Sequence, residues 1–265
     1  MLGAVAAGCA SSAVGVDGPG WVAVEGAEIA YTGRSGRGPV IVFESGLGDG
    51  LGVWAQTVAE LDASRGYFAY SRPGYEDSSA LADDARTSDE AARLLNQVLR
   101  AARVPPPYLF VGHSLGGLYI AKYAELYPRE IAGLVFVDGR PPRFRALCDE
   151  RGVEFCNGSR LRQTPANWPA HIVAESRGVE PTEAMAPAVE AISGAPVTVI
   201  TSTNVWPGDG GADAFALWLE AQARFANGFA SHRLVRAEGA GHYVQREQPA
   251  LVAAEIEALA QRISG

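Results

Sequence analysis

The stretch YLFVGHSLGGLYIAKYAELYP, residues 108–128, decides the fold of this chain. Its first four residues form an apolar run typical of a buried strand, and the residues from Leu115 onward are typical of an apolar helix. Between them lies GHSLG, which matches the pattern G-x-S-x-G. A serine raised on a sharp strand-to-helix turn leaves no room for Cβ atoms two residues to either side, so glycine is needed at both places.

Ser114 is the candidate nucleophile that this turn would carry. A chance Gly-Ser-Gly in a glycine-rich chain would rarely have a strand before it and an apolar helix after it. The turn would also aim the helix N-terminus, with its free amides and positive dipole end, at the place where an oxyanion forms.

Three segments together resemble the α/β-hydrolase superfamily, and within it the small bacterial serine esterase-like members. They are GHSLGG, the earlier VIVFESGLGDG and, near the C-terminus, EGAGHYVQREQP. The resemblance runs in order from about residue 21 to the end and weakens between about residues 140 and 196. It implies the α/β-hydrolase fold, a mostly parallel sheet with helices on both faces.

The alternation of strands and helices predicts the same class of fold, because such an order is typical of a parallel sheet covered on both sides. Residues 141–195 break the alternation and are rich in Pro, Arg and Glu, so we expect a cap or lid inserted there. One α/β-hydrolase domain should therefore span residues 21–265. The expected strands are residues 39–45, 67–70, 108–111, 133–137, 197–201 and 233–236, after a hairpin over 21–33; the expected helices include 53–61, 212–225 and 247–263.

Composition narrows the class of partner. With 265 residues, 48% of them hydrophobic and 20% charged, the chain is typical of one large globular domain. A net charge of -8 argues against a nucleic-acid or anionic-membrane surface. We expect a small-molecule ester as the partner, and composition leaves the oligomeric state open.

The N-terminal residues and the cysteines bear on localisation. MLGAVAAGCASS resembles a lipobox in which Cys9 would be lipidated, although it has no basic n-region and only a short apolar run. Residues 1–20 are thus either a lipoprotein signal remnant or a flexible tail, and the protein is either exported or lipid-anchored in a bacterium, or else cytoplasmic. Cys148 and Cys156 are expected to form a disulfide, which suits export, with two free thiols as the alternative.

A serine hydroxyl is a poor nucleophile at neutral pH and needs a positioned base, for which histidine is suited. His242 follows the last predicted strand, at the carboxyl edge where ligands bind in α/β sheets. It also obeys the chain order Ser…acid…His that the resemblance implies. The other histidines are expected to have structural roles; they are His113, His171 and His232.

The sequence does not fix which carboxylate is the partner of His242. The resemblance places it just after the strand PVTVITS, near Asn204 and Val205, and neither can carry the charge. Some members of the superfamily draw the acid from one strand earlier, where this chain has Asp138. We favour Asp138, with Asp209 next and Asp213, which also fits a helix N-cap, third.

An oxyanion hole requires two backbone amides. One is the N–H of Leu115, directly after Ser114. The resemblance implies that the other comes from the glycine-rich loop after residues 39–45, where Leu47 has the matching position. Leu47, Leu115 and Tyr243 are also expected to line an apolar pocket for the acyl group.

These residues predict a serine hydrolase that cleaves carboxylic esters through an acyl-enzyme, without a metal or an organic cofactor. Amidases, peptidases and lactonases use the same triad and remain alternatives. A non-catalytic receptor for a small ligand on the same fold is an alternative of another class. The absence of an acid at the usual position favours the receptor, and the Ser114/His242 pair favours the enzyme.

Overall fold

The computed structural model describes residues 16–81, 86–156, 167–192, 194–208 and 210–264. Cys9 and Asp209 lie outside these residues, so the lipobox hypothesis and the second candidate acid stay predictions. Among the helices of the described ranges, none has both the length and the apolar character needed to cross a bilayer.

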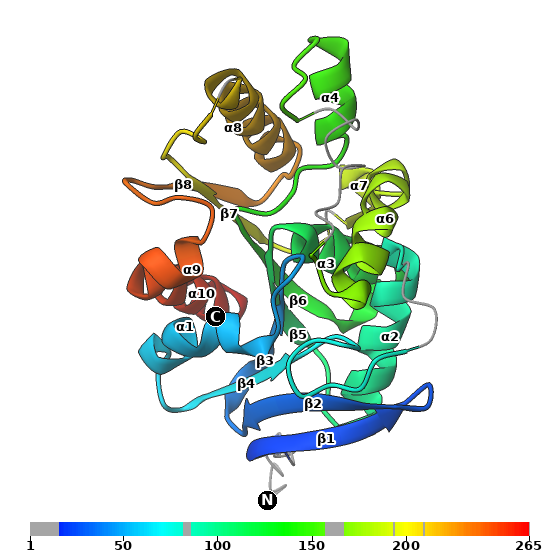
Figure 1. The fold of residues 1–265 in the computed structure, drawn as a ribbon. Helices are drawn as coiled ribbons and strands as arrows, with labels where there is room; N and C mark the ends of the chain where they lie inside the picture. The colour runs from blue at the N-terminus through cyan, green and yellow to red at the C-terminus, as the bar shows by residue number, and fades with distance from the viewer. Residues whose placement is uncertain (1–15, 82–85, 157–166, 193, 209, 265) are drawn as a thin grey trace, which may run out of the picture.

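The core of the molecule is one eight-stranded sheet in the order β1-β2-β4-β3-β5-β6-β7-β8 (Figure 1). Strands β3 to β8 run parallel to one another. At one edge, β1 and β2 form an antiparallel hairpin, and β2 pairs antiparallel with β4. The mostly parallel sheet is therefore confirmed. The strands are β1 (Gly18–Val24), β2 (Ala27–Arg34), β3 (Arg37–Glu44), β4 (Arg65–Tyr70), β5 (Tyr108–His113), β6 (Ile131–Val137), β7 (Val197–Ser202) and β8 (His232–Ala237).

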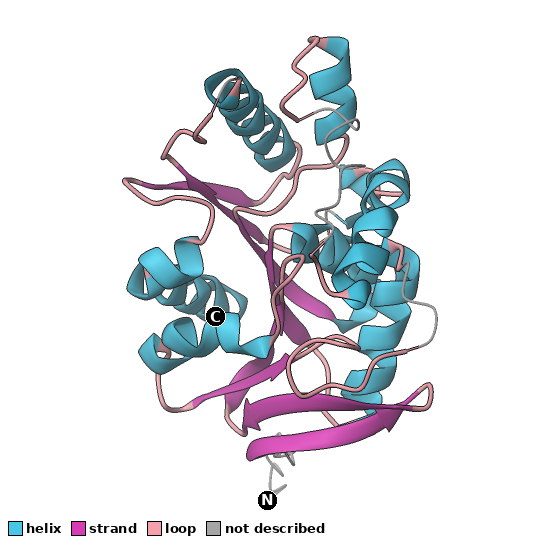
Figure 2. Ribbon diagram, viewed as in Figure 1, coloured by secondary structure: helices cyan, strands magenta, loops and turns pink. Residues whose placement is uncertain are grey.

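Helices cover both faces of this sheet, as Figure 2 shows. Alternate residues of β3 point to opposite faces, because successive side chains of a strand do so. Val42 packs in a core with residues of α2, α3 and α8, whereas Phe43 packs in a second core with residues of α10. The helices of these two layers are η1 (Leu51–Trp54), α1 (Ala55–Glu60), α2 (Ser88–Ala101), α3 (Leu115–Leu126), η2 (Pro128–Glu130), α8 (Gly211–Asn227), α9 (Val244–Glu247) and α10 (Pro249–Ser264).

The segment between β6 and β7 carries additional helices: α4 (Phe144–Glu150), α6 (Ala170–Ala184) and α7 (Val189–Ile192). Helix α6 lies against α2 and α3 (Figure 1). A disulfide joins Cys148 of α4 to Cys156. This is the segment in which the strand-helix alternation was expected to break, and its role as a cap stays a prediction.

Two local expectations need correction. Asp213 is not an N-cap, because α8 begins two residues before it at Gly211, with Gly210 as the N-cap in the left-handed conformation. The helix expected over 247–263 is α10, which begins two residues later at Pro249, and the short helix α9 precedes it. A proline fits there because the first amides of a helix have no partner within it.

Candidate active site

Ser114 occupies the turn between β5 and α3 with φ 50° and ψ -120°, outside the conformations that a serine normally adopts. The two glycines permit this. A Cβ atom on Gly112 would lie 2.8 Å from the carbonyl oxygen of Gly116, and a Cβ on Gly116 would lie 2.4 Å from that of Glu44. The predicted strand, strained turn and helix are thus confirmed.

Three side chains from distant parts of the sequence meet at Ser114. The Ser114 Oγ lies 3.0 Å from His242 Nε2, and His242 Nδ1 lies 2.7 Å from Asp138 Oδ2. They follow β5, β8 and β6, respectively. Because these strands are parallel, their carboxyl ends share one edge of the sheet, where ligands bind in such folds. The structure therefore brings together Ser114, His242 and the favoured acid.

Asp138 is completely buried and surrounded by donors. Its carboxylate accepts hydrogen bonds from the Ser202 amide (2.9 Å), the Ser202 hydroxyl (3.0 Å) and the Trp218 indole N–H (3.0 Å). Burial alone would raise the pKa of Asp138, but the hydrogen bond and charge of His242, together with these donors, outweigh it and hold the pKa below its ordinary value. An ionised Asp138 can only accept, so His242 donates from Nδ1 and leaves Nε2 free to take a proton from Ser114.

The third candidate acid has a different position. Asp213 lies in the first turn of α8 and is exposed to solvent. Near the usual position, Asn204 donates from its side chain to the carbonyl oxygen of Gly239. The structure therefore gives His242 a carboxylate partner from the earlier strand.

His113 supports the loop that carries His242. Its ring is buried, its Nε2 lies 3.0 Å from the carbonyl oxygen of His242, and the two ring centroids are 4.8 Å apart. Burial, with a smaller effect of His242, lowers the pKa of His113 to about 3. The ring is therefore neutral at ordinary pH and donates from Nε2, which is the structural role expected for it.

The remaining histidines contact other groups. His171, on α6, packs edge-on against the ring of Tyr75 with centroids 4.7 Å apart. His232 begins β8 and its Nδ1 lies 2.6 Å from the carbonyl oxygen of Phe229. Its position at the amino end of β8 is the sheet edge opposite Ser114.

The predicted oxyanion loop runs directly past Ser114. A Cβ atom on Gly46 would lie 3.1 Å from Ser114 Cβ, so the backbones approach closely there. The amides of Leu47 and Leu115 have no backbone acceptor among the described residues. Both are therefore available as donors, the second because the first amides of a helix lack partners within it.

The predicted pocket residues have mixed surroundings. Leu115 is only 2% exposed and packs with Leu118 and Tyr119, so its side chain offers almost no surface to a ligand. Leu47 is half-buried beside the same cluster. The Tyr243 ring lies 5.2 Å from that of His113, with the Arg246 guanidinium 4.9 Å from its centre. Tyr243 thus supports the histidine pair.

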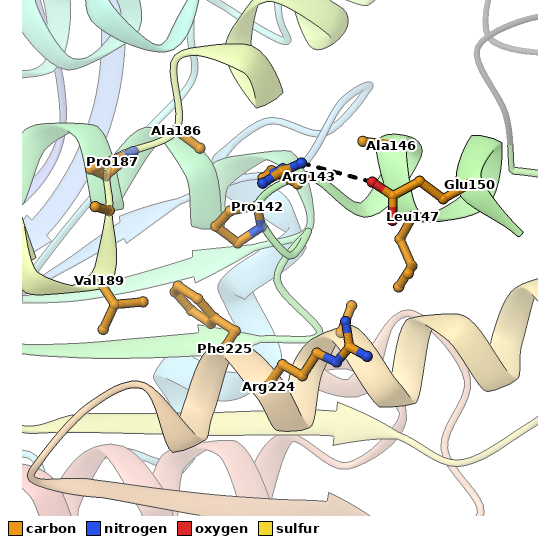
Figure 3. A pocket seen from close by; sticks show the side chains of 12 residues that line it. Pro142, Arg143, Ala146, Leu147, Glu150, Ala186, Pro187, Val189, Arg224 and Phe225 are labelled. Atoms are coloured by element: carbon orange, nitrogen blue, oxygen red, sulfur yellow. Dashed lines mark ion pairs between the residues drawn. The ribbon is translucent and has the colours of Figure 1, made fainter.

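A cavity of about 610 Å³ lies elsewhere, between α4, residues 186–189 and α8 (Figure 3). Arg143 and Glu150 form an ion pair of 3.8 Å at its wall, and Phe225 lies on the α8 side. Neither Ser114 nor His242 lines this cavity, so it is separate from the candidate active site.

Sequence reasoning missed a second buried cluster beside Ser114, made by Glu44, Arg72 and Glu175. A signal for Glu44 was available, because a carboxylate ends an otherwise apolar buried strand. No comparable signal links Glu175, which lies on α6, to Arg72, which follows β4.

The strand order, the strained serine turn and the site at the carboxyl edge define the class of protein, the α/β-hydrolase fold. Comparison with known proteins agrees. A family model described as "alpha/beta hydrolase fold" matches residues 39–154. The chain therefore has the α/β-hydrolase fold that its sequence motifs predicted.

The curated relatives match this chain over only part of their own length. The segment that matches "Uncharacterized protein YqjL" of Bacillus subtilis is 35% identical over 105 residues, 40% of this chain and 41% of that protein. The match to "Probable esterase PIR7A" of Oryza sativa is 35% identical over 101 residues, 38% of each chain. A solved thermophilic esterase from Thermogutta terrifontis shares the fold over 92% of this chain and 98% of its own, with TM-score 0.68 and 18% identity. The chain thus spans less than half the length of the curated relatives it matches.

Proposed function

We propose that this protein is a serine hydrolase that cleaves carboxylic esters through an acyl-enzyme. The observation that carries the proposal is the continuous hydrogen-bonded chain from Ser114 Oγ through His242 to Asp138, with contacts of 3.0 and 2.7 Å. The distance from nucleophile to base is within the reach that proton transfer requires.

In the first half of the reaction, His242 Nε2 takes the proton of Ser114 as Oγ attacks the ester carbonyl carbon. Asp138 stabilises the imidazolium that forms. The carbonyl oxygen becomes an oxyanion, which accepts hydrogen bonds from the amides of Leu47 and Leu115. When the carbon–oxygen bond to the leaving group breaks, the alcohol departs with the proton from His242.

In the second half, water attacks the acyl carbon while His242 takes one of its protons. The bond from the acyl carbon to Ser114 Oγ breaks, His242 returns the proton to Oγ, and a carboxylic acid leaves. We also infer that the helices within residues 141–195 form a cap over this site. The contact between Arg72, beside the oxyanion loop, and Glu175 of α6 supports that role.

A fluorophosphonate probe tests the proposal together with p-nitrophenyl esters of increasing acyl length. The wild type should be labelled and should release p-nitrophenol, whereas Ser114→Ala should do neither. Amide, peptide and lactone substrates in the same assay separate those hydrolase activities from ester cleavage. A folded wild-type protein that stays unlabelled would overturn the proposal in favour of a small-ligand receptor.

A further inference from the structure

The Arg72 cluster lies on the side of β5 opposite to Asp138, because Glu44 ends β3 and Asp138 follows β6. The Arg72 guanidinium is 2% exposed and forms a two-pronged pair with Glu175, from Nε to Oε1 at 2.6 Å and from Nη2 to Oε2 at 3.0 Å. Its Nη1 lies 2.6 Å from Glu44 Oε1. A permanent cation is thus fixed between two carboxylates beneath the oxyanion loop.

The same guanidinium also holds the backbone of that loop. Arg72 Nη1 donates to the carbonyl oxygen of Ser45 and Nη2 donates to that of Gly46, both at 2.7 Å. The carbonyl of Gly46 and the amide of Leu47 belong to one planar trans peptide, so they point in opposite directions. Fixing the Gly46 oxygen therefore fixes the direction of the Leu47 N–H.

Helix α6 reaches the loop by a second route. The Gly48 amide donates to the Tyr75 hydroxyl at 3.2 Å, and that hydroxyl donates to Glu175 Oε2 at 2.5 Å. Glu175 therefore orders both of the side chains, Arg72 and Tyr75, that bind the loop backbone. It does so from the segment between β6 and β7.

We propose that Arg72 is the positioning residue of the oxyanion hole, and that Glu175 couples this hole to α6. This inference rests on the proposed function. If bound substrate stabilises the packing of α6 against the sheet domain, it would also align the Leu47 amide with the oxyanion, through Glu175 and Arg72.

A purely stabilising role explains the cluster less well. Burying two acidic side chains with one guanidinium is costly, and buried ion pairs often add nothing to stability relative to apolar side chains of similar size. Arginine is also required by the geometry, since its planar fork can bind a carboxylate twice while other N–H groups bind carbonyl oxygens.

The test compares Arg72→Lys, Glu175→Gln and the control Glu183→Gln in the purified full chain. Glu183 lies on the same helix and is also buried; it accepts from Arg140 Nε and, at 3.0 Å, from the Arg145 amide. In the described part of the chain, the hydrogen bonds of its side chain go to Arg140 and Arg145, so Glu183→Gln changes a buried carboxylate of α6 without removing a contact to the oxyanion loop.

Arg72→Lys should lower kcat by about 10²–10³-fold, the loss typical of one oxyanion donor, with KM changed less than about twofold. Glu175→Gln should lower kcat by roughly tenfold, and Glu183→Gln should leave it within about twofold of wild type. The affinity for a trifluoromethyl ketone that matches the ester's acyl group should fall in parallel with kcat, because both depend on the oxyanion hole. The midpoint of the pH–rate profile should not move.

Equal losses in all three variants would indicate a general effect of α6 and overturn the inference. So would an Arg72→Lys protein with wild-type kcat, or ketone affinity that stays constant while kcat falls. If Arg72→Lys does not fold, Glu175→Gln against Glu183→Gln decides the question. A wild type that is inert to the fluorophosphonate overturns the proposed function itself, whereas an active wild type with unaffected variants overturns only the positioning role.

Discussion

Two buried carboxylates flank the strand that leads to Ser114, and they differ in charge behaviour. Glu44 ends β3 and Asp138 follows β6, and both are 0% exposed. Burial raises the pKa of Glu44 above its ordinary value, even though Arg72 and Tyr70 oppose the shift. Burial acts on the pKa of Asp138 in the same direction, but His242, Ser202 and Trp218 outweigh it and the net shift is downward.

The opposite pKa shifts arise from the neighbouring groups, because the two carboxylates are equally buried. Asp138 receives hydrogen bonds from three residues, whereas Glu44 is bonded by Tyr70 and Arg72 and also feels the negative charge of Glu175, which raises its pKa. The two sites suit different tasks. Asp138 is a single anion that would stabilise the imidazolium formed on His242 during the proposed reaction. Beside Glu44, the permanently charged Arg72 holds the backbone of the oxyanion loop in place.

Asp138→Asn should break the first of these sites with the largest effect. An amide in place of the carboxylate favours the wrong tautomer of His242 and removes the charge that stabilises its imidazolium, so kcat should fall by about 10⁴-fold. Steady-state hydrolysis of a p-nitrophenyl ester measures it. Asp213→Asn, at an exposed carboxylate, is the control and should keep wild-type kcat. If Asp138→Asn keeps its activity while Asp213→Asn or Asp209→Asn loses it, the catalytic acid would be one of the carboxylates after the later strand β7.

Glu44→Gln should act mainly on stability. The variant keeps the side-chain shape but removes one anion from Arg72, which retains its two bonds to Glu175. We expect the free energy of unfolding to fall by about 1.5–3 kcal/mol, the worth of a hydrogen bond to a charged group. Urea denaturation measures it. A loss of kcat as large as that of Asp138→Asn, in a protein of unchanged stability, would contradict the contrast between the two carboxylates.

Each carboxylate also has one hydroxyl donor that can be removed separately. Tyr70 donates to Glu44 at 2.5 Å and Ser202 donates to Asp138 at 3.0 Å. Tyr70→Phe and Ser202→Ala should each lower the free energy of unfolding by about 1.5 kcal/mol. Only Ser202→Ala should also lower kcat, by several-fold, because its carboxylate holds His242. Equal effects of the two variants on kcat would remove the distinction.

His113 extends the comparison to a buried base, which has too few hydrogen-bond acceptors around it to keep a positive charge. Because the pKa of His113 is lowered to about 3 in the folded protein, the unfolded chain alone binds this proton between about pH 6.5 and pH 3. Stability should therefore fall as pH falls through that window, by at most about 1.4 kcal/mol per pH unit from this residue. Urea denaturation at pH 7, 6 and 5 measures the slope. His113→Gln can still donate to the His242 carbonyl but does not titrate, so it should lack this part of the slope; identical slopes would contradict the assignment.

Much of the fold could be predicted because it depends on patterns that are local in sequence. Apolar runs predicted the central strands, and GHSLG predicted the strained turn at Ser114. His242 could be selected among four histidines from its place after the last strand. The N-cap of α8 was missed because a left-handed glycine supplies it instead of the Asp213 side chain.

Local sequence patterns were enough to predict the parallel sheet, the position of Ser114 at its carboxyl edge and the approach of His242 to that edge, since strand and turn preferences act over a few neighbouring residues. Only the tertiary structure showed that Asp138 lies beside His242, because that contact depends on how two strand ends 104 residues apart are aligned. It alone also joined Arg72 to Glu175, 103 residues away. Neither pairing follows from a local pattern; each exists because packing brings the charged groups together where water is excluded and protein groups must satisfy their charge.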